Sequence, residues 1–210
     1  MIRNKCKTIG LTGGIASGKT SVKNILLSKG YRVIDADLIA RQVVEKYKPS
    51  YYEVIKYFGD QVLDENKNID RLKLAHIIFN DSKKRKELES ILYPYIFAEI
   101  LRQIMDLCKD KPQVIFIDIP LLFENIRSIE ESGISFEEIW LVYCDMKTQI
   151  QRLTTRDNIS KEKALLRINA QMDIEEKRKL ADVVIENTSS KEFLLEQIDS
   201  YVSALEQEKV

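Results

Sequence analysis

Short, wholly apolar runs alternate along the chain with longer stretches in which apolar residues recur at helical spacing. The runs at 114–117 and 139–142 carry no polar side chain on either face, which is typical of strands buried on both sides in a parallel sheet. Strands interleaved with helices imply right-handed crossovers and therefore a doubly wound α/β core. The pattern predicts strands at residues 8–11, 31–35, 114–118, 139–143 and 183–186.

The region between the second and third predicted strands, residues 38–111, is too long for one crossover and has helical periodicity almost throughout. Asp70 is placed to cap one helix, and Asp81 or Ser82 the next. Pro94 can open the last helix, because proline is favoured in a first turn. We therefore expect a helical insertion subdomain, which in a transfer enzyme is the natural place for a second substrate. Its predicted helices cover residues 38–46, 50–58, 71–79, 83–92 and 94–108.

Composition narrows the functional class. Acidic and basic residues balance at 33 each, so no overall field draws the chain to nucleic acid or to a membrane surface, and no apolar run approaches a membrane span. Cys6, Cys108 and Cys144 lack C-x-x-C spacing, which favours reduced thiols over a zinc site, and the lone His76 excludes H-E-x-x-H zinc chemistry. We expect a cytoplasmic enzyme or switch, as a monomer or a weak homo-oligomer.

Residues 13–20 read G-G-I-A-S-G-K-T, a complete match to the phosphate-binding pattern G-x-x-x-x-G-K-[ST]. A predicted strand precedes this loop and apolar residues at helical spacing follow it, so backbone N–H groups and a helix N-terminus can surround an anion. Lys19 can reach the β- and γ-phosphates, and Thr20 offers a hydroxyl group to magnesium. The predicted nucleotide-binding residues are Gly14, Ile15, Ala16, Ser17, Gly18, Lys19, Thr20 and Ser21.

Acidic residues follow the second predicted strand, at the edge where parallel sheets bind their ligands. Asp37 is a candidate to accept the proton of an attacking hydroxyl group or to orient a metal ion, and it is also placed to cap the helix after it. Both roles are compatible. Arg41, one helical turn further on, can either pair with Asp37 or contact a substrate anion.

The third predicted strand ends in Asp118, as in the Walker B arrangement of an apolar strand and a carboxylate, so we expect Asp118 and Thr20 to bind magnesium. The loop that follows lies at the same edge of the sheet. Its Glu124 is either a substrate contact or a capping acid.

Basic residues at helical spacing follow the fourth predicted strand. Arg152 and Arg156 lie four residues apart, and Arg167 and Gln171 repeat that spacing. Together with an upstream phosphate-binding loop they favour a cationic lid that closes over transferring phosphate, although a solvated charged face has the same pattern. Asn187, after the last predicted strand, can meet a nucleotide base.

In combination these motifs resemble the dephospho-coenzyme A kinase family. The resemblance covers nearly the whole chain, and it is most specific where L-T-G-G-I-A-S-G-K at 11–19 is joined to V-I-D-A-D at 33–37. Further matching stretches are A-R at 40–41, P-L-L-F-E at 120–124, Q-R-L at 151–153, R-D at 156–157, residues 164–171 and A-D-V-V-I at 181–185.

The resemblance implies transfer of the ATP γ-phosphoryl group to the ribose 3′-hydroxyl group of dephospho-coenzyme A, with Mg²⁺ as the metal ion. Asp37 matches the carboxylate proposed as the base in the family, and Lys19, Arg152 and Arg156 are the other expected catalytic residues. The acceptor is expected to contact Asp35, Arg41, Tyr93, Pro120, Leu121 and Glu124.

The resemblance also implies an organisation for the chain. The expected fold is a five-stranded parallel sheet of the P-loop kinase type, with a helical insertion and a helical lid. The expected units are a nucleotide-binding core at residues 1–37 and 112–210, an acceptor subdomain at 38–111, and a lid at 146–175 within the core.

The chain departs from the family pattern at two places. The family often has His-Pro where this chain has Tyr93-Pro94. After the last strand the family commonly has Asn, then Asn or Asp, then Gly, where this chain has Asn187-Thr188-Ser189.

Two competing functions stay open. The first is another small P-loop kinase that acts on a nucleoside monophosphate or a metabolite. The second, a nucleotide-dependent switch, is disfavoured because the chain has no N-K-x-D motif.

Overall fold

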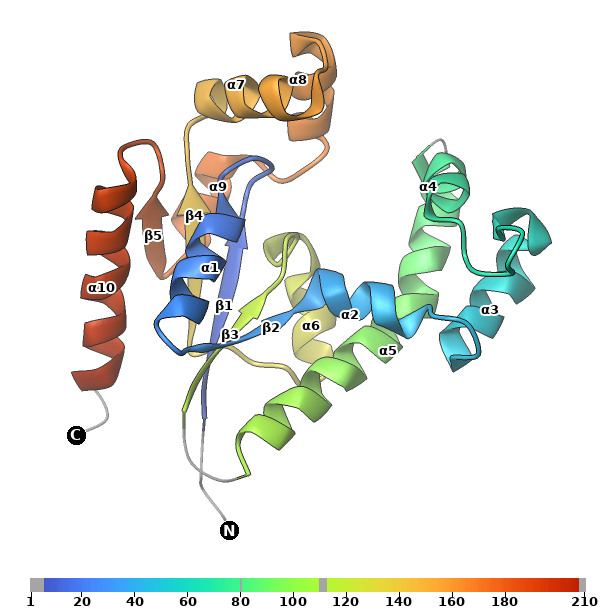
Figure 1. The fold of residues 1–210 in the computed structure, drawn as a ribbon, viewed down its shortest axis with the longest axis horizontal. Helices are drawn as coiled ribbons and strands as arrows, with labels where there is room; N and C mark the ends of the chain where they lie inside the picture. Colours follow the sequence, from blue (N-terminus) through green and yellow to red (C-terminus); the bar gives the residue numbers. More distant parts are fainter. Residues whose placement is uncertain (1–5, 80, 110–112, 208–210) are drawn as a thin grey trace.

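A parallel sheet forms the centre of the computed structural model, which describes residues 6–79, 81–109 and 113–207. Its strand order is β2-β3-β1-β4-β5, and each neighbouring pair is parallel. This confirms the predicted doubly wound sheet of five strands (Figure 1). The strands are β1 (Lys7–Gly13), β2 (Arg32–Asp35), β3 (Val114–Asp118), β4 (Glu138–Tyr143) and β5 (Val183–Glu186).

Alternate side chains of the central strands enter two separate apolar layers. In β3, which is buried along its whole length, Ile115 and Ile117 join one layer, whereas Val114 and Phe116 join the other. Burying one such side chain stabilises the fold by about 2 kcal/mol. The wholly apolar run in the sequence therefore reflects a strand that is covered on both faces.

Helices cover both faces of the sheet (Figure 1). One apolar layer lies under α1 (Lys19–Ser28) and α10 (Lys191–Gln207). The opposite layer packs against α2 (Ala36–Val43), α5 (Ser82–Leu107) and α6 (Ile126–Glu131). Among the described residues, no helix combines the length and the apolar character needed to span a membrane.

The helical insertion extends to one side of the sheet and has its own small core (Figure 1). It contains α3 (Pro49–Phe58), the short helix η1 (Asp60–Val62) and α4 (Arg71–Phe79), together with α2 and most of α5. The core residues are Val54, Phe58, Val62, Leu74 and Leu88.

One helix differs from its prediction. Pro94 does not open a new helix but lies inside α5, which runs without a break from Ser82 to Leu107. An internal proline removes one backbone hydrogen bond and costs about 3 kcal/mol. The buried residues Ile96, Phe97 and Ile100 follow it and pack against the sheet layer, which offsets that cost.

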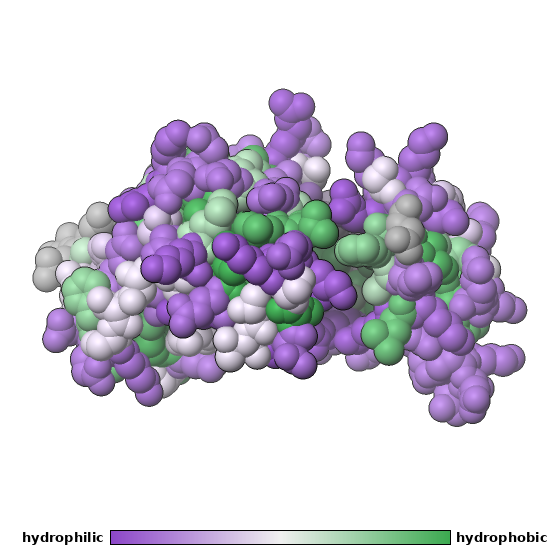
Figure 2. All heavy atoms as spheres, turned by 90° about the horizontal axis from the view of Figure 1, so that it is seen from above, coloured by the Kyte–Doolittle hydropathy of each residue, from purple (hydrophilic) through white to green (hydrophobic). Residues whose placement is uncertain are grey.

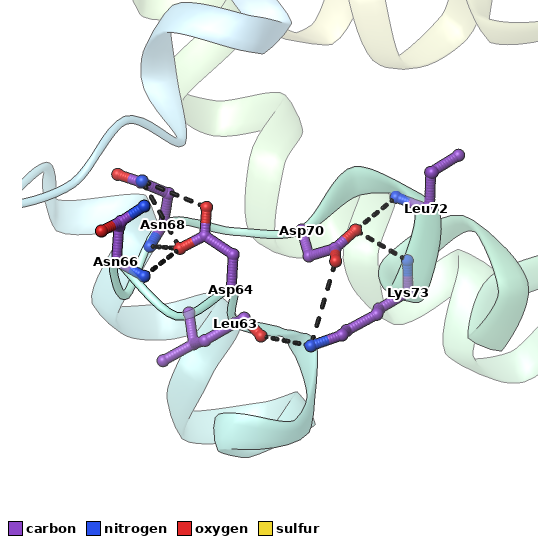
Figure 3. Close-up of polar contacts among 7 residues, drawn as sticks. All are labelled: Leu63, Asp64, Asn66, Asn68, Asp70, Leu72 and Lys73. Carbon is purple, nitrogen blue, oxygen red and sulfur yellow. Dashed lines mark hydrogen bonds and ion pairs between the residues drawn. The ribbon is translucent and has the colours of Figure 1, made fainter.

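Aspartates order one turn and two helix starts in the insertion. Asp64 accepts hydrogen bonds from the backbone N–H groups of Asn66 and Asn68 at 2.9 and 2.8 Å, which lowers the pKa of its carboxyl group (Figure 3). Asp70 accepts from the second and third residues of α4 at 2.9 and 3.1 Å. Asp81 does the same for α5, so the predicted caps at Asp70 and Asp81 are confirmed.

The cysteines do not all remain thiols. Cys6 and Cys108 form a disulfide across 102 residues of sequence, which corrects the expectation of reduced thiols. Their spacing carries no signal, because the contact depends on the start of the β1 segment meeting the end of α5. Cys144 is a buried thiol, and burial raises its pKa to about 11.

Candidate active site

The loop between β1 and α1 has the conformation that its glycines predict. Ala16 and Gly18 have φ values of +59° and +92°, which turn successive N–H groups towards one centre. A Cβ atom on Gly18 would lie 2.0 Å from Nδ2 of Asn187, and one on Gly14 would lie 2.3 Å from Nε2 of Gln149. At Gly18 both the positive φ and close packing favour glycine, whereas at Gly14 close packing alone does.

Gly18→Ala is expected to weaken ATP binding by at least about tenfold, because the new methyl group must displace Asn187 from the loop. Gly30→Ala is the matched control. Gly30 also has a positive φ, +86°, but nothing lies within 4 Å of its Cβ position. Titration of ATP into both variants tests this prediction, and equal affinities would contradict it.

Arg152 and Asn187 brace the phosphate-binding loop from the opposite side. Arg152, on α7 (Met146–Asp157), donates from Nη1 to the carbonyl oxygen of Ser17 at 3.2 Å and from Nη2 to that of Asn187 at 2.7 Å. Asn187 donates from Nδ2 to the same Ser17 oxygen at 2.7 Å. The structure thus brings together a predicted lid residue, a predicted base contact and the loop itself.

The predicted lid region contains a pair of helices, α7 and α8 (Lys161–Asn169), which lies above the loop (Figure 1). Leu153, Ala164 and Ile168 form its core. Asp157 binds Nε of Arg156 at 2.7 Å and also pairs with Arg167, and these guanidinium groups lower the pKa of its carboxyl group. Arg156 lines the cleft over the loop.

Two carboxylates and two lysines meet at the carboxyl edge of β2 and β3. Lys19 pairs with Asp118. Lys23, one turn further along α1, lies 2.6 Å from Oδ2 of Asp35 and 3.3 Å from Oδ2 of Asp118. Burial lowers the pKa of Lys23, but these carboxylates outweigh that effect and the pKa is raised. Sequence reasoning missed Lys23, and its four-residue spacing from Lys19 was the available signal.

Asp35 and Asp37 have different roles. Asp35 caps α2 by accepting the N–H of Leu38 at 2.9 Å, so the alternative in which Asp37 is the cap is wrong. Burial raises the pKa of Asp35, but hydrogen bonds from Lys23 and Leu38 and the nearby lysine charges outweigh it, so the pKa is lowered.

Asp37 lies inside the first turn of α2 and faces the cleft. Desolvation by the surrounding protein raises the pKa of Asp37, and the carboxylates of Asp35 and Asp118 add to this increase. The charges of Lys19 and Arg41 oppose the increase but do not cancel it. Asp37 therefore has a higher proton affinity than an ordinary aspartate.

Two cavities meet at Asp37. The larger, of about 850 Å³, is lined by the phosphate-binding loop, Lys19 and the α7 arginines. The smaller, of about 160 Å³, lies between α2, α5 and the loop after β3 and is mainly apolar. Both are lined by Asp37 and Pro120. Figure 2 shows the surface hollowed between the sheet core and the insertion, with hydrophobic residues at both rims. We call these cavities the donor cleft and the acceptor pocket.

The predicted acceptor residues divide into two groups. Tyr93, Pro120 and Leu121 line the acceptor pocket. The Tyr93 hydroxyl group donates to Oδ1 of Asn125 at 3.0 Å, and burial raises its pKa to about 12. Asp35, Arg41 and Glu124 line neither cavity among the described residues, and Glu124 instead accepts the backbone N–H of Met172, between α8 and α9.

Lys23→Met is expected to lower kcat/KM by about tenfold, because it removes a charge-assisted hydrogen bond of about 1.5 kcal/mol that orients Asp35 and Asp118. Lys29→Met is the matched control, since Lys29 lies at the other end of α1 and pairs with Asp199. Steady-state kinetics of both variants provide the test. The prediction fails if both retain the wild-type value.

Comparison with known proteins shows which family the chain is similar to. Residues 7–192 match the family model for dephospho-CoA kinase. The dephospho-CoA kinase of Carboxydothermus hydrogenoformans is 46% identical over 90% of this chain and 90% of its own length. That of Oceanobacillus iheyensis is 43% identical over 91% and 94%. The solved structure of dephospho-CoA kinase from Campylobacter jejuni is 31% identical, with a TM-score of 0.69 over 97% of this chain and 98% of that one.

Proposed function

The chain belongs to the dephospho-CoA kinase family, and from that premise we propose how its site transfers the γ-phosphoryl group of ATP to the 3′-hydroxyl group of dephospho-coenzyme A. The reaction gives coenzyme A and ADP and completes coenzyme A synthesis. The observation that carries the proposal is that the donor cleft and the acceptor pocket meet at Asp37.

On the donor side, the N–H groups of residues 14–20 and the Lys19 ammonium group hold the ATP phosphates. Lys19 pairs with Asp118 in the described state, so it leaves this partner when phosphate binds. Lys23 keeps its contact with Asp118, which preserves the orientation of that carboxylate. Arg152 and Arg156 neutralise charge on the transferring group as the lid closes.

On the acceptor side, Asp37 accepts the proton of the 3′-hydroxyl group while the ribose oxygen forms a bond to the γ-phosphorus. The bond from that phosphorus to the β–γ bridging oxygen breaks, and the electron pair leaves with ADP. The raised pKa of Asp37 suits a base that takes up a proton during the transfer. Tyr93, Pro120 and Leu121 support the bound acceptor from the apolar side of the pocket.

The residues fit a magnesium ion that is bound chiefly through nucleotide phosphates. Thr20 and Asp118 supply oxygen donors, which Mg²⁺ prefers. Among the described residues no group of three His, Cys, Asp or Glu side chains is placed to hold a metal ion. Thr20 and Asp118 would hold a magnesium ion together with phosphate and water oxygens. When bound, Mg²⁺ neutralises charge on the β- and γ-phosphates.

The division into a nucleotide core (residues 1–37 and 112–210), an acceptor subdomain (38–111) and a lid (146–175) is part of this proposal. It is supported by the position of the acceptor pocket between α2, α5 and the loop after β3. A cytoplasmic location, and a monomeric or weakly oligomeric state, stay predictions.

An acceptor panel tests the proposed function. ADP release is measured with ATP and, in turn, dephospho-coenzyme A, AMP, CMP and shikimate. We expect kcat/KM for dephospho-coenzyme A to exceed that for each other acceptor by at least about 100-fold. A nucleoside monophosphate that is phosphorylated faster would instead favour the alternative kinase activity.

A further inference from the structure

A buried ion pair joins the loop after β3 to the helix that follows α8. Lys177, on α9 (Ile174–Leu180), is 0% exposed, and its Nζ lies 2.7 Å from Oε1 of Glu124. The same oxygen accepts the backbone N–H of Met172 at 3.0 Å. A buried lysine is costly unless a carboxylate accompanies it, so this contact is part of the interior of the protein.

Both sides of this contact lead directly to the active site. Glu124 lies in the short helix η2 (Phe123–Asn125), between Leu121 and Asn125, which line the acceptor pocket. On the other side, Gln171 precedes Met172 in the segment between α8 and α9, residues 170–173. Oε1 of Gln171 accepts the N–H of Ile15 in the phosphate-binding loop at 2.9 Å, and Gln171 lines the donor cleft.

We propose that Glu124 and Lys177 are positioning residues for phosphoryl transfer, which fix residues 170–173 between the loop after β3 and the phosphate-binding loop. Glu124 holds the N–H of Met172, and the neighbouring Gln171 is thereby set against Ile15. The acceptor pocket and the donor cleft are then kept in one relative position while α7 and α8 move. The proposal rests on the proposed kinase function and replaces the expected acceptor contact of Glu124.

The charges of Glu124 and Lys177 can be removed separately from the hydrogen bond that Glu124 accepts from Met172. Oε2 of Glu124 and Nζ of Lys177 are both buried and have no hydrogen-bond partner among the described residues, so Lys177 contributes its charge and not a hydrogen bond. Removing only one charge leaves the other buried and unpaired, which destabilises strongly, whereas replacing both charges is often tolerated. Double variants can therefore keep the fold while they change only the acceptor for the Met172 N–H.

The test uses two double variants without the buried charges. Glu124→Gln/Lys177→Met retains an oxygen for the N–H of Met172, and Glu124→Leu/Lys177→Met does not. We expect melting temperatures within about 4 °C of each other and kcat at least about tenfold lower in the leucine variant. ATP affinity should agree within about threefold, because neither variant changes a residue of the phosphate-binding loop or Gln171 itself. Equal kcat values in the two variants would overturn the proposal.

Hydrogen exchange of the wild-type protein provides a second readout that requires no variant to fold. The Met172 amide should exchange at least about 100-fold more slowly than an unprotected amide, because it is held in the interior. Exchange at the unprotected rate would overturn the proposal. A failure of the proposed function would give a different result. The wild-type protein would then not turn over dephospho-coenzyme A, although its Met172 amide would still be protected.

Discussion

Replacement of Lys19 by methionine is expected to lower kcat/KM for coenzyme A formation by about 10²–10³-fold, equivalent to about 3–4 kcal/mol. The Lys19 side chain is only 16% exposed and lies at the mouth of the phosphate-binding loop, where its charge acts in a partly desolvated site. Methionine keeps much of the apolar stem but removes the ammonium group that neutralises the β- and γ-phosphates. The measurement is steady-state coenzyme A formation.

Two controls accompany this variant. Lys23 retains its contact with Asp118, so Lys19→Met should keep a cooperative thermal transition. Lys29→Met, which removes a lysine from the other end of α1, should retain near-wild-type kinetics. Activity of Lys19→Met within about tenfold of the wild type would show that the transferring phosphate does not depend on this charge.

Asp37→Asn is expected to lower kcat by about 10²–10⁴-fold, which is the range of general-base contributions. Asparagine has nearly the same shape but cannot accept the proton of the 3′-hydroxyl group. Binding of ATP should change little, because the phosphate-binding loop and Lys19 are intact. The kcat of this variant and its equilibrium affinity for ATP are the two quantities to measure.

The raised pKa of Asp37 gives this prediction a further signature. A carboxyl group whose pKa is higher in the folded state opposes folding at pH values above that pKa, and this opposition disappears as the pH falls towards the unfolded-state pKa. Asp37→Asn removes it, so the melting temperature at neutral pH should be equal to or slightly above that of the wild type. The acid limb of the wild-type pH–rate profile should lie above the ordinary aspartate pKa of about 3.9.

Sequence reasoning succeeded where the physical signal is local. The strands were predictable because apolar runs mark burial on both faces, and the phosphate-binding loop because its glycines are required at fixed spacing. The caps at Asp70 and Asp81 depend on backbone groups within three residues. The family resemblance then supplied the activity, which the comparisons support over most of the chain.

The remaining features depend on contacts between distant segments. Glu124 meets the Met172 N–H across 48 residues, and Cys6 meets Cys108 across 102. The continuity of α5 through Pro94 follows from packing against the sheet, which outweighs the local preference of proline for a first turn. No pattern of neighbouring residues predicts any of these three features.

The most direct test of the account is a rapid-quench single-turnover experiment with ATP and dephospho-coenzyme A on the wild type and Asp37→Asn, with ATP affinity titrated separately. The account predicts that Asp37→Asn binds ATP within about threefold of the wild type and transfers the γ-phosphoryl group at least about 100-fold more slowly. Transfer at the wild-type rate by Asp37→Asn would contradict the assignment of Asp37 as the base.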